Sequence, residues 1–416
     1  MDALEQRLCS LIAARERDLR AELARHVAIP TGHNHTPGLD EYRSILTHRL
    51  SNLGANLESF PGDHRPDWIE PPRPQTDSAS GTKRIIPPTV VCRSTLAQRP
   101  TNGFKRILIA GHIDTVFPPD SPFRAVTTAP DGATATGPGV VDMKGGILIA
   151  LTALEALAEA GVGVCWTFLL NSDEETGSYH SDRILRAEGA RHDVGIALEP
   201  AVPPKPGSDA WGLAVERKGS GQFMIEVRGR SAHAGRDFDK GISAVYTLAG
   251  VLKRIEALSD LSRGITVNVG PISGGKATNV VPDHAAAWGN VRYPDEPAGA
   301  QIRATLEAMA TAPDAMPAIV VHTSFNRPAK PLTPEVNSFA EFVRATASEL
   351  RQPIAPASTG GVCDGNNLQA AGLPTLDTLG VRGGGLHTHD EWIDLSSLVE
   401  RAQLMAVLLR RLSDRG

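Results

Sequence analysis

Five short segments of the chain hold histidines and carboxylates at spacings that suit metal-assisted hydrolysis. The first reads GHIDT around His112 and Asp114, and it follows a run of apolar residues. Because side chains alternate along a strand, His112 and Asp114 point the same way, so the carboxylate of Asp114 could orient the imidazole from behind. On its own, a His-x-Asp pair is more often structural than functional.

The next three segments place carboxylates at the start of a predicted helix or at the end of a predicted strand. Asp142 stands in GPGVVDMKGG, where capping of the following helix would also explain it. Glu174 and Glu175 stand in NSDEETG after one apolar strand, and Glu199 stands in ALEP after another. Acidic runs are usually solvated, but strand ends are where α/β folds place their sites.

The fifth segment, GLHTHDEW near the C-terminus, offers His387 and His389 after three glycines. With Asp114 set behind His112 and one of the two C-terminal histidines counted, the five segments supply two histidines and four carboxylates, Asp142, Glu174, Glu175 and Glu199. That set suits a pair of divalent ions bridged by one carboxylate and one water, with one carboxylate left over as a base. The combination favours a two-metal site over five separate structural explanations.

Alternating strands and helices are predicted to position these segments. Apolar strands are expected at 106–111, 164–170 and 194–198, and a helix is expected at 144–160. Buried strands separated by helices indicate an α/β fold, with a mixed, mostly parallel sheet flanked by helices. The proline-rich residues 61–88 are expected to form an irregular surface excursion.

A different pattern follows a second proline-rich stretch, residues 200–210. The helices expected there lie at 242–258 and 301–311, and the half-buried strands at 222–229, 265–269, 284–293 and 319–324. Two helices on one face of an antiparallel sheet make an α+β unit. Because the α/β pattern resumes near Pro331, we predict a catalytic domain of residues 1–210 and 329–416, with an inserted domain of residues 211–328.

The composition argues against several other classes of protein. With 416 residues the chain is long enough for two domains, and its net charge of −5 leaves no basic surface for nucleic acid. The four cysteines are scattered with no CxxC pair, so free thiols are expected. Residues 1–26 read as one amphipathic helix rather than a signal peptide or membrane anchor. We therefore expect a cytoplasmic protein that binds neither nucleic acid nor membrane.

The combined motifs resemble those of the zinc aminoacylase and exopeptidase family. This family includes acetylornithine deacetylase, succinyl-diaminopimelate desuccinylase and glutamate carboxypeptidase. Within it, the sequence most resembles the glutamate carboxypeptidase (carboxypeptidase G) branch. The resemblance runs from GHIDTV at 111–116 to HTHDEW at 387–392. It implies that the inserted domain is a ferredoxin-like lid that also forms a homodimer.

The resemblance also implies roles for residues of the five segments. Glu174 is implied as the general base, with Asp114 behind the first ligand. His387 is preferred over His389 because the family places this ligand four positions before a glutamate, here Glu391. Met143 stands where the family often has an acidic residue, and we expect this departure to be neutral for metal binding. The implied metal ligands, with Asp142 bridging two ions, are His112, Asp142, Glu175, Glu199 and His387.

Substrate contacts are implied by the resemblance as well. His233, in SAHAG, matches a histidine that reaches the active site of the partner subunit and stabilises the oxyanion. Asn279 and Arg292 match positions that grip the substrate carboxylate, for which arginine is suited by its bidentate geometry. The glycine-rich loop around Gly361 matches a loop that faces the substrate.

The resemblance therefore implies a metal-dependent hydrolase that cleaves the amide bond of N-acyl-amino acids or small peptides with a free carboxylate. Zinc is the favoured ion for two imidazoles and several carboxylates, and manganese or cobalt would also fit. One alternative is hydrolysis of a non-peptide C–N bond by the same two-metal core. Another is a catalytically silent peptide-binding dimer, which Glu174 argues against because a binding module needs no base.

Overall fold

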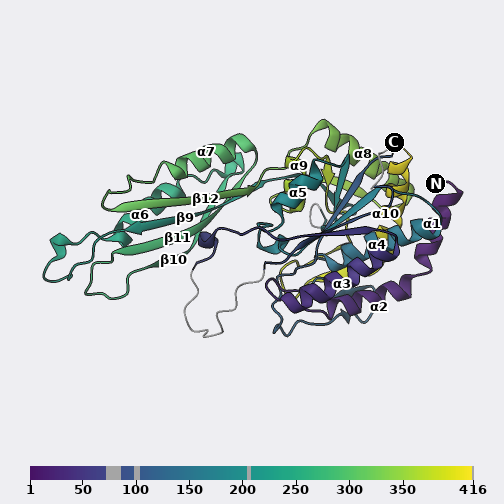
Figure 1. Ribbon diagram of the computed structural model, residues 1–416, viewed down its shortest axis with the longest axis horizontal. Helices are drawn as coiled ribbons and strands as arrows, with labels where there is room; N and C mark the ends of the chain where they lie inside the picture. Colours follow the sequence, from purple (N-terminus) through teal and green to yellow (C-terminus); the bar gives the residue numbers. More distant parts are fainter. Residues whose placement is uncertain (72–85, 98–103, 204–207, 415–416) are drawn as a thin grey trace.

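The larger part of the structure is built on a six-stranded sheet (Figure 1). The computed structural model describes residues 1–71, 86–97, 104–203 and 208–414. The strand order is β1-β2-β6-β3-β7-β14, in which β6, β3, β7 and β14 pair in parallel, and β2 pairs antiparallel with both β1 and β6. The strands are β1 Asn56–Phe60, β2 Thr89–Arg93, β3 Ile107–His112, β6 Trp166–Asn171, β7 Val194–Ala197 and β14 Thr375–Leu376. The mixed, mostly parallel sheet predicted from the apolar runs is confirmed.

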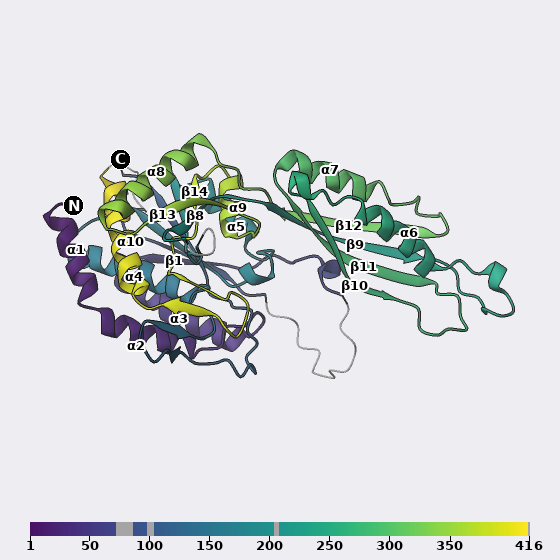
Figure 2. The ribbon, with the colours of Figure 1, turned by 180° about the vertical axis from the view of Figure 1, so that it is seen from behind.

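Helices cover both faces of this sheet (Figure 2). On one face α4 (Lys144–Glu159) is buried along most of its length beneath α10 (Ser397–Ser413). On the other face α5 (Asp182–Gly189) and α9 (Asp364–Ala370) pack against alternate residues of the same strands. The predicted helix at 144–160 is confirmed. The remaining helices of this part are α1 Ala3–Ala13, α2 Glu16–Val27, α3 Thr36–Asn52 and α8 Pro334–Glu349.

The prediction of a single helix over residues 1–26 was wrong. The chain ends one helix at Ala13 and begins another at Glu16. The break lets α1 and α2 bury their apolar sides separately, Leu8 and Ile12 in the first and Leu19 and Leu23 in the second. Helical periodicity alone does not reveal such a break, because both helices keep the same spacing of apolar residues.

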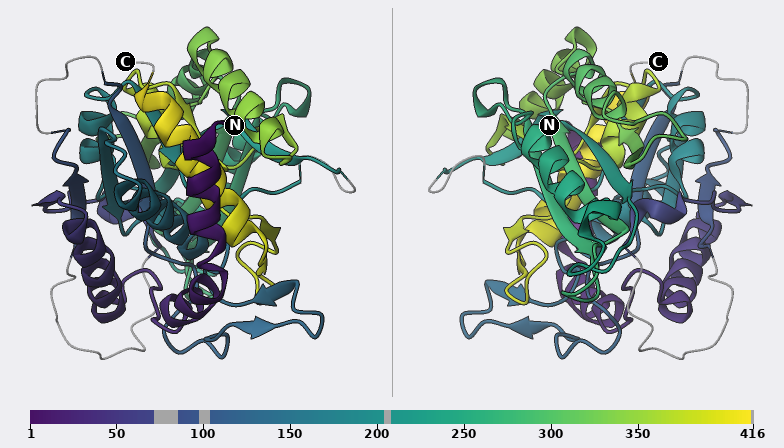
Figure 3. Two further views of the ribbon diagram at one scale, coloured as in Figure 1. Left: turned by 90° about the vertical axis from the view of Figure 1, so that its right-hand side faces the viewer. Right: turned by 90° about the vertical axis from the view of Figure 1, so that its left-hand side faces the viewer.

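A second, antiparallel sheet lies beside the α/β part, with the strand order β10-β11-β9-β12 (Figure 1). Its strands are β9 Gly219–Arg228, β10 Thr266–Gly274, β11 His284–Tyr293 and β12 Ala318–Arg327. Helices α6 (Ala244–Glu256) and α7 (Glu296–Glu307) cover one face and bury Phe223, Ile225 and Val227 of β9. Seen end-on, both helices lie on the same side of this sheet (Figure 3). The α+β pattern expected after residue 210 is confirmed.

The chain enters and leaves the second sheet at neighbouring points. Strand β8 (Trp211–Arg217) still pairs in parallel with β13 (Ile354–Thr359) of the α/β part. The backbones of Arg217 and Lys330 then exchange two hydrogen bonds of 2.9 Å. The division of the chain at residues 210/211 and 328/329 stays a prediction, and the pairing of β8 favours a start of the insertion near Gly219 rather than at residue 211.

The loops around the sheet carry further short elements. A small sheet joins β4 (Thr127–Thr128), β5 (Thr134–Thr136), β15 (Gly383–Gly384) and β16 (Trp392–Asp394). Of the two proline-rich stretches, residues 72–85 and 204–207 lie outside the described residues. All four cysteines are free thiols, as expected. Across the described ranges, no helix is long and apolar enough to cross a membrane.

Candidate metal centre

Three neighbouring strands bring the predicted acidic residues and the first histidine to one edge of the large sheet. His112 is the last residue of β3, which lies between β6 and β7 and runs parallel to both. Glu174 and Glu175 lie in the single turn that follows β6, and Glu199 follows the end of β7. Carboxyl ends of adjacent parallel strands meet at the same edge, so these side chains converge.

Asp142 lies between the two histidines, with one carboxylate oxygen towards each. Its Oδ1 is 3.2 Å from His112 Nε2, and its Oδ2 is 3.5 Å from His387 Nε2. His387 Nε2 also lies 3.2 Å from Glu175 Oε2. Potential ligand atoms of His112, Asp142 and Glu175 fall within 4.8 Å of one another. This arrangement suits a carboxylate that bridges two ions.

A glycine pair allows Asp142 to come this close to the strand ends. Gly145 and Gly146 lie in the first turn of α4, which begins at Lys144, two residues after Asp142. A Cβ atom on Gly146 would lie 2.3 Å from the carbonyl oxygen of Leu198, the residue before Glu199. Only glycine permits that approach, and it holds the start of α4 against the end of β7.

The charges at this edge fit a divalent cation. Burial, followed by repulsion from Asp142 and Glu174, raises the pKa of Glu199 well above its usual range, and its Oε1 lacks a hydrogen-bond partner. Burial raises the pKa of Glu175 to about 8, and Asp142 adds to this. Although burial opposes it, hydrogen bonds from His112 and His387 lower the pKa of Asp142. Several buried carboxylates with an oxygen left unsatisfied are the donor set that a divalent ion neutralises.

His387 is held in a loop between β15 and β16. Its φ of 62° lies in the left-handed region, which a non-glycine residue adopts at some cost. Hydrogen bonds to Asp142 and Glu175 raise the pKa of His387 to about 10. His389 instead stacks on Phe123, with ring centroids 5.4 Å apart. The structure therefore brings His387, and not His389, to the acidic cluster.

Glu391, which sequence reasoning used only for spacing, anchors the loop that carries Asp142. Its buried carboxylate accepts hydrogen bonds from the backbone amides of Gly139 at 3.0 Å, Val141 at 2.9 Å and Asp142 at 3.1 Å. Burial, followed by repulsion from Asp142, raises the pKa of Glu391 to about 7. The segments of Asp142 and His387 are thus tied together through this one side chain.

Asp114 does more than lie behind His112, because it also binds the backbone of the acidic turn. Its carboxylate accepts hydrogen bonds from the backbone amides of Glu174 at 3.3 Å and Glu175 at 3.0 Å. The same carboxylate lies 3.5 Å from His112 Nδ1, whereas the Asp114 carbonyl oxygen lies closer, at 3.0 Å. Asp114 therefore fixes the acidic turn and lies behind the histidine at the same time.

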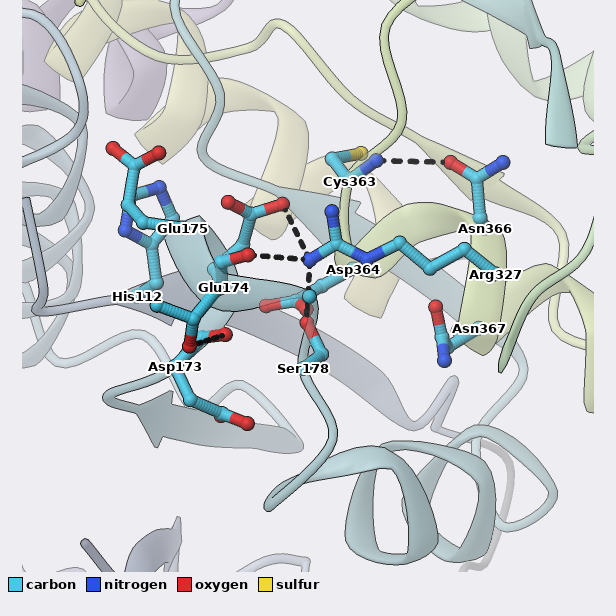
Figure 4. Close-up of polar contacts among 12 residues, drawn as sticks. His112, Asp173, Glu174, Glu175, Ser178, Arg327, Cys363, Asp364, Asn366 and Asn367 are labelled. Carbon is cyan, nitrogen blue, oxygen red and sulfur yellow. Dashed lines mark hydrogen bonds and ion pairs between the residues drawn. The ribbon is translucent and has the colours of Figure 1, made fainter. Parts of the chain in front are cut away.

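Glu174 is held by an arginine that the sequence analysis did not single out (Figure 4). Arg327 Nη2 lies 2.8 Å from Glu174 Oε1 and donates to the carbonyl oxygen of Glu174 at 2.7 Å and to Ser178 Oγ at 2.6 Å. Ser178 in turn donates to Asp364 at 2.6 Å. Burial, followed by repulsion from Glu174, raises the pKa of Asp364 to about 7. No local motif marks Arg327, because it reaches Glu174 from the end of β12 in the second sheet.

A cavity of about 460 Å³ opens beside this cluster. Arg292 and Gly361, both predicted to contact substrate, line it together with Glu174, Glu199 and His387. Arg217 lines the cavity too and was missed by the sequence analysis, since its pairing with buried Asp377 at 2.8 Å depends on tertiary contacts. The cavity and the acidic cluster form one continuous site.

Two predicted residues lie far from this site within the chain. His233 and Asn279 are exposed, and a backbone bridge joins His233 to Val280. His233 and Asn279 lie in loops at the end of the second sheet where Arg228 pairs with His284. Arg292 lies at the opposite end, where it pairs with Ser220. Eight residue steps along β9, from Ser220 to Arg228, separate these ends, a length of about 27 Å. One chain therefore does not bring Asn279 and Arg292 to the same carboxylate.

Known proteins share both the motifs and the fold. The model of the peptidase family M20/M25/M40 matches residues 108–411. A carboxypeptidase G2 from a Pseudomonas species is 27% identical over 324 residues, covering 74% of each protein. A succinyl-diaminopimelate desuccinylase from Methylorubrum populi is 31% identical over 399 residues, covering 88% of the chain and 92% of the relative.

Solved structures agree on the architecture. A tripeptidase from Staphylococcus aureus superposes with a TM-score of 0.73 at 20% identity, covering 96% of the chain and 99% of that structure. The aminopeptidase PepT from Bacillus cereus gives a TM-score of 0.70 at 22% identity, covering 95% and 98%. At these identities the likeness establishes the fold.

Proposed function

The chain belongs to the peptidase family M20/M25/M40, and from this premise we propose that it releases amino acids with a free carboxylate from N-acyl-amino acids or short peptides. It is a metal-dependent hydrolase of C–N amide bonds. The observation that carries the proposal is the position of Asp142 between His112 and His387, beside Glu174. The names of its relatives, a carboxypeptidase and a desuccinylase, support the substrate class.

We propose that two divalent ions occupy the cluster, with Asp142 as the shared ligand. His112 and Glu199 would hold one ion, and Glu175 and His387 the other. Zinc is favoured by the two imidazoles, while manganese or cobalt also suits this donor set. When bound, such ions lower the pKa of a water and polarise a carbonyl oxygen.

The side chains around the cluster would handle the proton and the substrate. Glu174 takes the proton from the attacking water and delivers it to the leaving amine. Arg327 keeps the Glu174 carboxylate in place through its ion pair at 2.8 Å. Arg292 binds the free carboxylate of the substrate: its Nη1 is buried without a hydrogen-bond partner, and among the described residues no carboxylate pairs with it. Gly361 contributes to the wall of the same cavity.

We further propose that the protein acts as a homodimer in the cytoplasm. The exposed His233 and Asn279 would complete the site of the partner subunit, since they lie too far from the acidic cluster of their own chain. His233 would then stabilise the oxyanion that develops on the scissile carbonyl. The four free thiols support a reducing compartment.

The test is hydrolysis of a panel of N-acyl-glutamates, N-acyl-aspartates, other N-acyl-amino acids and dipeptides. Each is assayed after chelation and again after zinc, manganese or cobalt is added back. We expect release of a free amino acid that chelation abolishes and metal restores. Silence across the panel with two metals bound per chain would contradict the substrate class and favour hydrolysis of a non-peptide C–N bond.

A further inference from the structure

Residues 63–70, which we name the strap, cross from the α/β part to the second sheet (Figure 1). At the first end, the Asp63 amide donates to the His180 carbonyl oxygen at 3.0 Å, and His180 Nδ1 lies 2.6 Å from the Asp63 carbonyl oxygen. At the second end, Trp288 Nε1 donates to the Trp68 carbonyl oxygen at 2.7 Å. The Trp68 ring also stacks on His322, with centroids 5.7 Å apart. The strap is therefore fixed to both parts of the molecule.

The strap lies on the face of the second sheet that α6 and α7 leave uncovered. Trp288 and His322 both stand opposite Met224 of β9, so all three side chains share one face. Phe223 and Ile225, the neighbours of Met224, point to the other face and pack in the core beneath the helices. Because strand side chains alternate between faces, the strap and the helices lie on opposite sides of the sheet.

The strap forms one wall of a second cavity, of about 360 Å³, beside the metal centre. Arg65 and Glu70 of the strap line it, together with Gln222, Asn290 and Arg292 of the second sheet. Glu175, Arg292 and Arg327 line both this cavity and the larger one of about 460 Å³. A molecule held at the cluster can therefore extend into both cavities.

The two cavities differ in the chemistry of their walls. The larger one has an apolar wall, which includes Val202, Pro203, Ala214, Ala357 and Leu386. The smaller one is lined mostly by arginines, amides and carboxylates, with Ile69 and Val362 as its larger apolar side chains. An acyl group suits the first cavity, and a charged amino acid suits the second.

Arg65 is positioned to bind an anion in the smaller cavity. Its side chain is only 11% exposed, and its Nη2 lies 2.7 Å from Glu70 Oε1. A guanidinium carries five N–H donors, so this ion pair leaves donors for a second carboxylate. Arg292 lines the same cavity and has a buried Nη1 without a partner. Two arginines on one polar cavity fit a molecule with two carboxylates.

We propose that the strap supplies Arg65 as a specificity-determining residue, which binds the side-chain carboxylate of an acidic leaving amino acid whose α-carboxylate is held by Arg292. This inference rests on the proposed function, because it assigns the amino-acid half of that substrate to the smaller cavity. The strap lies outside residues 108–411 that match the family model, so family membership does not account for Arg65.

The experiment compares kcat/KM for an N-acyl-L-glutamate and the N-acyl-L-glutamine with the same acyl group. Arg65→Gln should lower kcat/KM for the glutamate substrate roughly 10- to 100-fold, the effect of one lost charged hydrogen bond, and leave the glutamine substrate within about twofold. The kcat/KM of Arg65→Lys for the glutamate substrate should lie between those of wild type and Arg65→Gln. An equal loss of kcat/KM on both substrates would show a structural role for Arg65, and wild-type kcat/KM values on both would show no role; either result overturns the proposal.

The matched control is Arg183→Gln. Arg183 pairs with Asp63 at the foot of the strap through an exposed contact of 3.0 Å, and such pairs contribute little. This variant should leave both kcat/KM values within about twofold, which separates the loss of a specific arginine from a general disturbance of the strap.

A binding measurement separates this inference from the proposed function. Calorimetry with the zinc-loaded enzyme gives the dissociation constants of free L-glutamate and free L-glutamine. We expect tighter binding of L-glutamate by wild type and a loss of that preference in Arg65→Gln. If no N-acyl-amino acid is hydrolysed but this preference is found, the proposed reaction fails while the role of Arg65 stands. Equal affinity of wild type for both amino acids would overturn the inference.

Discussion

Arg327 and Glu174 form an ion pair of 2.8 Å that joins the second sheet to the acidic cluster. Arg327 is the last residue of β12, and it also binds the backbone of Glu174. Both side chains are buried, so neither can exchange its partner for water at low cost. The orientation of the proposed base therefore depends on the position of the second sheet.

Arg327→Met should lower kcat roughly 10- to 100-fold, because Glu174 loses the group that orients it. The free energy of unfolding should also fall by about 3–5 kcal/mol, since a buried carboxylate is left unpaired. Steady-state kinetics and urea unfolding measure the two effects. Arg254→Met, on an exposed position of α6, is the matched control and should change neither. A wild-type kcat in Arg327→Met would show that the ion pair does not position the base.

Glu174→Ala should lower turnover steeply while leaving two metals bound per chain. A general base contributes to proton transfer but not to metal affinity, so kcat should fall about 10²- to 10⁴-fold. Metal content by mass spectrometry after dialysis is the second measurement. Loss of metal together with activity would instead make Glu174 a ligand.

His387→Ala should reduce the bound metal from two ions to about one per chain, because His387 is the histidine on the second half of the cluster. His389→Ala removes ring contacts with Phe117 and Phe123, each worth about 0.5–1.5 kcal/mol, so both ions should remain with at most about tenfold weaker affinity. Metal titration against a chelating dye distinguishes the two variants. If His389→Ala loses one ion and His387→Ala keeps both, His389 rather than His387 is the ligand.

Asp377→Asn should destabilise the protein by about 3–5 kcal/mol at neutral pH, because it leaves buried Arg217 and Lys330 without their carboxylate. Burial alone would raise the pKa of Asp377, but Arg217 and Lys330 outweigh it and lower the pKa. A carboxyl with a lowered pKa in the folded state stabilises above its unfolded pKa of about 3.9, and this contribution is lost as pH falls through the folded value.

Urea unfolding of wild type and Asp377→Asn between pH 3 and pH 8 tests this dependence. The difference in the free energy of unfolding should stay constant above about pH 5 and shrink below about pH 4. Asp239→Asn, at an exposed position, is the control and should follow wild type throughout. If this difference in the free energy of unfolding instead grows as the pH falls, the pKa of Asp377 is raised in the folded state, and the prediction is wrong.

Coexpression of Glu174→Ala and His233→Ala chains should restore activity that neither variant has alone. If His233 serves the site of the partner, each mixed dimer has one intact site. Random pairing then gives about one quarter of wild-type activity, because half of the dimers are mixed and one of their two sites works. Absence of any recovery, with mixed dimers isolated by two affinity tags, would show that His233 does not serve the site of the partner subunit.

Sequence reasoning was effective where chemistry lies next to a strand end. The apolar runs before His112, Glu174 and Glu199 predict buried strands, and the carboxyl ends of parallel strands necessarily share an edge. The convergence of these three residues in the structure follows from that local pattern. Whether they bind metal stays a prediction that the experiments above address.

Contacts between distant elements could not be predicted in this way. Arg327 meets Glu174 across 153 residues of sequence, and Asp364 meets Ser178 across 186. Periodicity reports which face of an element is buried but not which element covers it. The same limit applies to the predicted start of the insertion at residue 211, because the pairing of β8 with β13 joins strands more than a hundred residues apart.

The chain enters and leaves the second sheet at the neighbouring residues Arg217 and Lys330. During synthesis, the second sheet with its helices can therefore fold before the α/β part. The strands and helices from Gly219 to Arg327 emerge together and have their own core, so this unit can fold while the α/β part is still incomplete. The α/β part must wait for β14, His387 and the covering helix α10, which are made after this unit. His387, the last of the five proposed ligands along the chain, thus leaves the ribosome only after the other four, so the growing chain presents no complete set of the proposed ligands before His387 emerges.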